Sequence, residues 1–168
     1  MTIFVLMGVS GTGKSTVGRA VSEALDLPFV DADDLHSPLA IAKMSRGVAL
    51  TSKDRRPWGK AIAQHLKTVL AQTGSPHIFL ACSALELGFR KRLRAAFSGD
   101  VVYLHLHGDL ITLKRRMNAR KDHFFKPEML AGQFAALEMP KRAHVIDIAL
   151  PVKAQVERIR TIMNSGTA

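Results

Sequence analysis

Short apolar runs alternate with longer amphipathic segments along this chain. The first run is apolar and β-branched throughout, which predicts a strand buried on both faces. With the four runs like it, the expected strands cover residues 2–8, 27–33, 77–83, 101–108 and 143–151. Between them, apolar residues recur at helical spacing. The expected helices cover residues 15–27, 58–74, 84–97, 109–120 and 151–163.

The alternation of strands and helices predicts an α/β fold. Right-handed strand–helix–strand units give a parallel sheet covered by helices on both faces. The 168 residues fit one domain, so residues 1–168 are expected to form a single unit. Two segments rich in polar side chains interrupt this alternation of strands and helices, residues 34–57 and 121–142. Such long insertions usually carry lids and substrate pockets.

The composition indicates a globular protein and narrows where it works. Apolar residues make up 47% of the chain, enough for a core, and no run approaches the roughly 18 residues of a membrane span. The chain starts without a basic leader, so we expect no secretory signal. The single cysteine, Cys82, cannot form an internal disulfide, which favours a cytoplasmic location.

The formal net charge of +10 raises the question of an anionic partner. Basic residues gather in segments 89–94, 114–123 and 157–160. Aromatic residues are only 6% of the chain, and none alternates with these bases as a base-stacking surface would require. The charge therefore favours small phosphorylated ligands over nucleic acid.

Residues 8–16, GVSGTGKST, match the phosphate-binding pattern G-x-x-x-x-G-K-[ST] at every fixed position. An apolar strand precedes them and an amphipathic helix follows, the context in which this loop binds nucleotides. Lys14 is expected to reach the β- and γ-phosphates, and the Ser15 hydroxyl to bind Mg²⁺. The residues expected to hold ATP are Gly8, Val9, Ser10, Gly11, Thr12, Gly13, Lys14, Ser15 and Thr16.

Three carboxylates, Asp31, Asp33 and Asp34, lie at the end of the second expected strand. Ligands bind beyond the carboxyl ends of the strands in such sheets, so these acids should face the nucleotide. Asp31 and Asp33 should point the same way if both continue the strand. We assign Asp33 to the acceptor hydroxyl and Asp31 to the Mg²⁺ shell through water, and the reverse assignment remains open.

The sequence resembles the gluconokinase family over nearly its whole length. The resemblance rests on GVSGTGKST, on residues 31–58 with their D-D-L-H and D-R-x-P-W motifs, on ACSALELGFRKRLR at 81–94, and on residues 119–140 with H-F-F, Q-F and L-E-x-P. It implies a P-loop NTPase fold of the nucleoside monophosphate and shikimate kinase type, with a five-stranded parallel sheet and a LID insertion at about 118–138. It also implies transfer of the γ-phosphate of ATP to D-gluconate, giving 6-phospho-D-gluconate.

The resemblance assigns further residues to the site. Arg116 and Arg120, four apart on one helix face, would be LID arginines that neutralise transition-state charge. Residues expected to hold the sugar acid are His36, Lys43, Arg55, Arg90 and His123. Arg55 and Arg90 are favoured for its carboxylate, because a guanidinium matches that group.

Some positions depart from the family pattern, which commonly has a lysine where Glu86 stands. The prediction of a kinase is therefore stronger than the prediction that gluconate is its substrate. One alternative is another small-molecule P-loop kinase, shikimate-like or specific for a different sugar acid. A second is a basic nucleotide-dependent module that binds RNA. The family is often dimeric, so a homodimer is also an expectation, and no membrane partner is expected.

Overall fold

The computed structural model describes residues 1–97, 99–119 and 129–165 and contains one five-stranded sheet. The strands are β1 (Thr2–Met7), β2 (Phe29–Asp31), β3 (His77–Ala81), β4 (Asp100–His107) and β5 (His144–Asp147). Their order is β2-β3-β1-β4-β5, and every neighbouring pair is parallel. The predicted fold class is confirmed.

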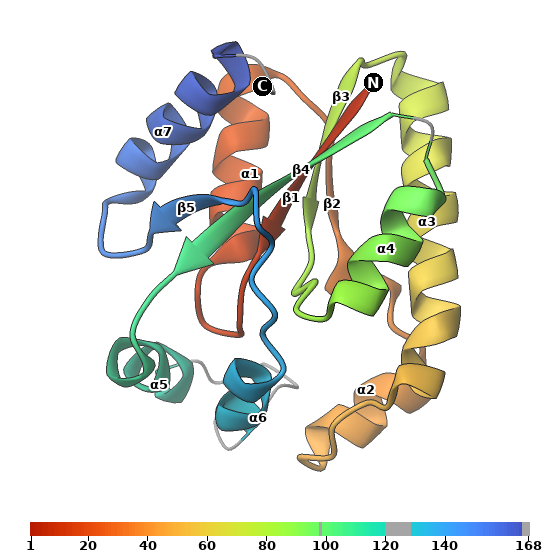
Figure 1. The fold of residues 1–168 in the computed structure, drawn as a ribbon, viewed down its shortest axis with the longest axis vertical. Helices are drawn as coiled ribbons and strands as arrows, with labels where there is room; N and C mark the ends of the chain where they lie inside the picture. Colours follow the sequence, from red (N-terminus) through yellow and green to blue (C-terminus); the bar gives the residue numbers. More distant parts are fainter. Residues whose placement is uncertain (98, 120–128, 166–168) are drawn as a thin grey trace.

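Helices cover both faces of the sheet (Figure 1). On one face lie α1 (Lys14–Leu25) and α7 (Val152–Asn164), and on the other lie α3 (Ser52–Thr73) and α4 (Leu87–Ala95). The alternation of β1 supplies both cores. Phe4 and Leu6 pack in the cluster that contains α1 and α7, whereas Ile3 and Val5 pack in the cluster that contains α3 and α4. No helix in the described ranges is long and apolar enough to cross a bilayer.

Helix α3 begins at Ser52, whereas the sequence predicted a start at residue 58. Pro57 precedes that predicted start by one residue, and the structure accommodates it inside the helix. A capping box explains the earlier start. The Thr51 side chain accepts the Asp54 N–H, and the Asp54 carboxylate accepts the Thr51 N–H at 2.8 Å. This cap brings Arg55 into the first turn of a regular helix.

Both polar insertions contain helices that the periodicity did not predict. The first holds a 3₁₀ helix, η1 (Ala32–Leu35), and α2 (Pro38–Ser45), which Ser37 caps through the Ala40 N–H. The second holds α6 (Leu130–Ala135), after α5 (Leu110–Asn118). Figure 1 shows α2, α5 and α6 at the end of the molecule where the strands terminate. The insertions therefore surround the carboxyl edge of the sheet.

Candidate active site

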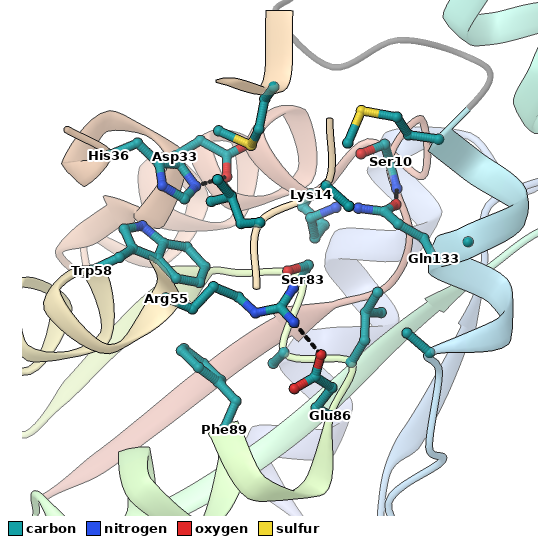
Figure 2. Close-up of a pocket in the computed structure, with 18 of the residues that line it drawn as sticks. Ser10, Lys14, Asp33, His36, Arg55, Trp58, Ser83, Glu86, Phe89 and Gln133 are labelled. Carbon is teal, nitrogen blue, oxygen red and sulfur yellow. Dashed lines mark hydrogen bonds and ion pairs between the residues drawn. The ribbon is translucent and has the colours of Figure 1, made fainter. Parts of the chain in front are cut away.

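A cavity of about 390 Å³ opens at the carboxyl edge of the sheet. Its walls come from the phosphate loop, the first insertion, the β3–α4 loop and α6 (Figure 2). The polar and charged side chains that line it are Ser10, Lys14, Asp33, His36, Arg55, Ser83, Glu86 and Gln133. Lys14 and Asp33 therefore face one space, as a transfer between a nucleotide and an acceptor requires.

The phosphate loop has the backbone that its glycines imply. Gly8 has φ 140°, and a Cβ there would lie 2.7 Å from the Leu106 carbonyl oxygen, so no larger residue fits. Gly13, with φ 91°, is the N-cap of α1 and offers no side chain to the first-turn amides. A Cβ at Gly13 would meet no atom within 4 Å. The N-terminus of α1 therefore has no capping side chain and has open space beside Gly13, an arrangement that suits an anion.

Two local hydrogen bonds and one long-range hydrogen bond hold this loop. The Lys14 ammonium donates hydrogen bonds of 3.0 Å to the carbonyls of Gly8 and Val9. The Ser10 N–H donates to Gln133 Oε1 at 2.6 Å, across 123 positions of sequence. Gln133 lies on α6, inside the region expected to form the LID. The phosphate loop and that region are thus joined by one side chain.

Asp31 and Asp33 do not share a strand face, so the prediction of a strand that continues through both acids is wrong. The strand ends at Asp31, and the chain turns into η1, which contains Asp33. Asp31 caps η1, because its Oδ1 accepts the Asp33 N–H at 3.1 Å. Asp33 lines the cavity and Asp31 does not. The turn therefore separates the two carboxylates that the sequence analysis treated as a pair.

An aromatic stack forms the wall behind Asp33. The His36 and Trp58 rings lie parallel with centroids 4.4 Å apart, and His36 Nε2 is 3.8 Å from Asp33 Oδ1. Trp58 is buried, and its indole N–H donates to the Ala32 carbonyl at 2.6 Å. Burial lowers the pKa of His36, and this outweighs the opposing effect of the Asp33 charge. His36 is therefore a neutral group at neutral pH.

The three cations expected to hold the sugar acid are already engaged. Lys43 donates to Asp54 at 2.6 Å, the main reason why the pKa of Asp54 lies far below its usual range. Arg55 pairs with Glu86, and Arg90 is buried and donates to the carbonyls of Ala84 and Leu85. Of the three, only Arg55 lines the cavity.

The remaining predicted residues lie at other places. Arg116, on α5, is exposed and donates to the Ile148 carbonyl at 3.0 Å. Ser15 is half-buried and Thr16 exposed in the first turn of α1. Arg120 and His123 fall outside the described residues.

Among the polar residues that line the cavity, sequence reasoning missed Ser83 and Gln133. Ser83 follows the end of β3, so the rule that ligands lie beyond the carboxyl ends of strands could have identified it. Gln133 belongs to the Q-F pair in the resemblance, but nothing local to the sequence shows that it reaches the phosphate loop.

Comparisons with known proteins agree with this geometry. The shikimate kinase family model matches residues 10–161. The thermoresistant gluconokinase of Escherichia coli (strain K12) is 36% identical over 168 residues, covering 98% of this chain and 94% of that protein.

Two solved structures are similar along nearly the whole chain. A sugar kinase from Janibacter sp. HTCC2649, in an unliganded structure, has a TM-score of 0.86 at 36% identity and covers 98% of this chain and 95% of its own. A gluconokinase from Sinorhizobium meliloti 1021 has a TM-score of 0.77 at 36% identity, covering 99% and 97%. With the phosphate loop and the facing carboxylate in one cavity, these matches show that the chain belongs to the gluconokinase family of P-loop kinases.

Proposed function

We propose that this protein transfers the γ-phosphate of ATP to the 6-hydroxyl of D-gluconate, forming 6-phospho-D-gluconate and ADP. The observation that carries the proposal is the shared cavity of Lys14 and Asp33. The gluconokinase names of the relatives from E. coli and S. meliloti support the choice of acceptor.

The phosphate loop supplies the nucleotide half of the site. Gly8, Val9, Ser10, Gly11, Thr12 and Gly13 form its backbone, and its amides, with those of Lys14, Ser15 and Thr16, would surround the phosphate oxygens. The Lys14 ammonium would exchange the two loop carbonyls for the β- and γ-phosphates.

The chain fits a Mg²⁺ that arrives with the nucleotide. No group of three or more His, Cys, Asp or Glu side chains in the described ranges could hold a metal alone, so the phosphates would supply several ligands. Ser15 would contribute its hydroxyl, and Asp31 would act through water. Mg²⁺ bound with ATP neutralises charge on the transferred phosphoryl group.

Asp33 would carry the acceptor half of the reaction. Its carboxylate would orient the 6-hydroxyl and accept the proton as the oxygen bonds to the γ-phosphorus and the bond to ADP breaks. The neutral His36 would contact acceptor hydroxyls, and Arg55 the sugar-acid carboxylate. Lys43 and Arg90 would act indirectly. Lys43 would hold Asp54, and Arg90 would hold the β3–α4 loop.

The LID arginines complete the proposal. Arg116 and Arg120 would neutralise charge on the γ-phosphate, and His123 would bind the acceptor. The Arg116 guanidinium would give up its hydrogen bond to the Ile148 carbonyl and bind the nucleotide instead.

A panel assay of ATP consumption tests this function. The purified protein would be incubated with ATP, Mg²⁺ and, separately, gluconate, shikimate, other sugar acids and nucleoside monophosphates. We expect the highest kcat/KM with gluconate. Absence of turnover with saturating gluconate refutes the proposal, and turnover with another acceptor only would reassign the substrate. Size-exclusion chromatography tests the expected homodimer, and gel shifts at two salt concentrations test the expected lack of RNA binding.

A further inference from the structure

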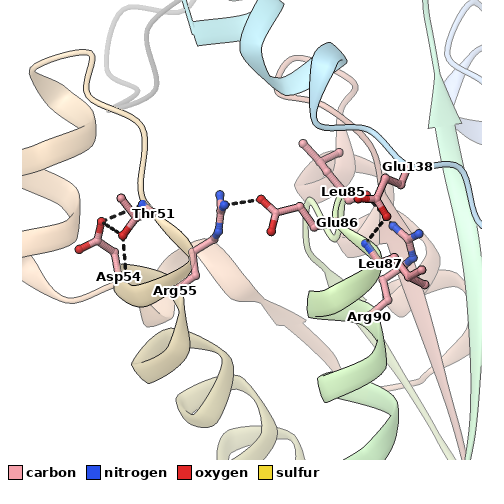
Figure 3. Close-up of polar contacts among 8 residues, drawn as sticks. All are labelled: Thr51, Asp54, Arg55, Leu85, Glu86, Leu87, Arg90 and Glu138. Carbon is pink, nitrogen blue, oxygen red and sulfur yellow. Dashed lines mark hydrogen bonds and ion pairs between the residues drawn. The ribbon is translucent and has the colours of Figure 1, made fainter.

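An ion pair crosses the acceptor side of the cavity. The Arg55 Nη2 group donates to Glu86 Oε1, joining the first turn of α3 to the β3–α4 loop (Figure 3). The two side chains are 29% and 28% exposed, and both line the cavity. This pair is therefore part of the wall that an acceptor would meet.

Glu86 stands on a firmly held loop. Arg90 Nη1 donates to the Ala84 carbonyl at 2.8 Å and the Leu85 carbonyl at 2.6 Å. The Glu138 carboxylate accepts the Leu87 N–H at 3.0 Å, and the Glu138 N–H donates to the Leu85 carbonyl at 3.0 Å. These four bonds leave the backbone on either side of Glu86 little freedom.

The Glu86 carboxylate has no structural use within its own helix. Glu86 is the N-cap of α4, but its side chain makes no capping hydrogen bond. It points instead across the cavity to Arg55 (Figure 3). The Glu86 carboxylate therefore serves the wall of the cavity rather than the end of α4.

The charges on the acceptor side of the cavity disfavour the binding of an anionic sugar acid. Asp33 and Glu86 are negative, Arg55 is positive, and His36 is neutral because burial lowers its pKa. Lys14 lies at the phosphate loop, where its ammonium contacts the Gly8 and Val9 carbonyls. A sugar acid must therefore share Arg55 with a carboxylate already in place.

We propose that Glu86 is a specificity-determining residue that weakens the preference of this enzyme for anionic over neutral acceptors. An entering carboxylate competes with Glu86 for the Arg55 guanidinium and is repelled by the Glu86 charge. A neutral polyol of the same length meets neither effect. The inference rests on the proposed function, since it concerns the same acceptor pocket.

The test compares D-gluconate with D-glucitol, the neutral polyol of the same chain length. Calorimetry would give the Kd of each ligand for the wild type, Glu86→Gln, Glu86→Asp and Glu138→Gln. Glu86→Gln removes the charge with little change in shape. Glu86→Asp keeps the charge and should leave the ratio of the two Kd values near that of the wild type. Glu138→Gln removes a nearby charge outside the cavity while keeping an oxygen for the Leu87 N–H.

We expect Glu86→Gln to lower the Kd for gluconate roughly fivefold to tenfold, the effect of one partly buried charge at close range. The Kd for glucitol should stay within twofold, and Glu138→Gln should change neither. An unchanged gluconate-to-glucitol ratio in Glu86→Gln overturns the inference. Weaker gluconate binding also overturns it, because Glu86 would then position Arg55 for the acid. Turnover of gluconate by the wild type, measured on the same preparation, separates these outcomes from failure of the proposed function.

Discussion

Replacing Trp58 by phenylalanine tests how the fold positions the acceptor side of the site. Trp58 lies in the second turn of α3, and its indole N–H bonds to the carbonyl of Ala32, the residue before Asp33. Its ring also stacks on His36. Phenylalanine keeps an aromatic ring at the stack but cannot make the hydrogen bond.

The size of the effect follows from these contacts. The bond is buried, so its loss leaves the Ala32 carbonyl unsatisfied, at a cost of about 1–3 kcal/mol. The smaller ring loses packing against His36 and Phe89, which adds about 1 kcal/mol. A total of about 2–4 kcal/mol corresponds to a fall in Tm of roughly 10 °C for a domain of this size.

Differential scanning calorimetry would measure the change in Tm, and steady-state kinetics at 25 °C the effect on the site. Because the bond lies next to Asp33, we expect kcat with gluconate to fall about 3- to 10-fold, on the scale of 1 kcal/mol of lost positioning. The KM for ATP should stay unchanged and serves as the internal control. A Tm within 2 °C of the wild type would show that the Ala32 carbonyl finds another partner and would refute the reasoning.

Three further predictions concern the site and the core. Lys14→Ala should abolish phosphoryl transfer while the circular dichroism spectrum stays that of the wild type; near-normal turnover would contradict the assigned role of the phosphate loop. Asp33→Asn should lower kcat at least about 10²-fold with little change in ATP binding; loss of Mg·ATP affinity with kcat retained would instead exchange the roles of Asp31 and Asp33. Burial lowers the pKa of His105 to about 4, so below pH 6.5 the unfolded chain binds a proton that the folded chain does not. The free energy of unfolding should therefore fall by about 1–2 kcal/mol between pH 7 and pH 5 in urea titrations, and His105→Gln should reduce this dependence; an equal slope in both proteins would disprove it.

The fold followed from local signals because strands and helices of this kind leave strong periodic patterns. All five strands lie where the apolar runs placed them, and the phosphate loop was fixed by its spacing. Helix boundaries were predicted less accurately than the helices themselves. The capping box of Thr51 and Asp54 begins α3 at Ser52, six residues before the start that the apolar spacing predicted.

In the candidate site, too, some features followed from local sequence and others depended on contacts between distant residues. The spacing of Gly8, Gly13 and Lys14 predicted an anion-binding loop, because that chemistry depends on consecutive residues. Which cations are available depends on partners far along the chain. Lys43 pairs with Asp54, Arg55 pairs with Glu86, and the buried Arg90 donates to backbone carbonyls. The three predicted sugar-acid ligands therefore have different roles.

The sequence by itself determined the parallel sheet, the phosphate loop and the place of Asp33 at the carboxyl edge of the sheet, since each is set by neighbours within a few residues. Only the tertiary structure decided that Gln133 reaches Ser10 and that Glu86 faces Arg55. Those contacts join residues 123 and 31 positions apart. The reason is physical. Side chains on opposite sides of a cavity come into contact only when the helices and loops that carry them pack together, and no local sequence pattern encodes that packing.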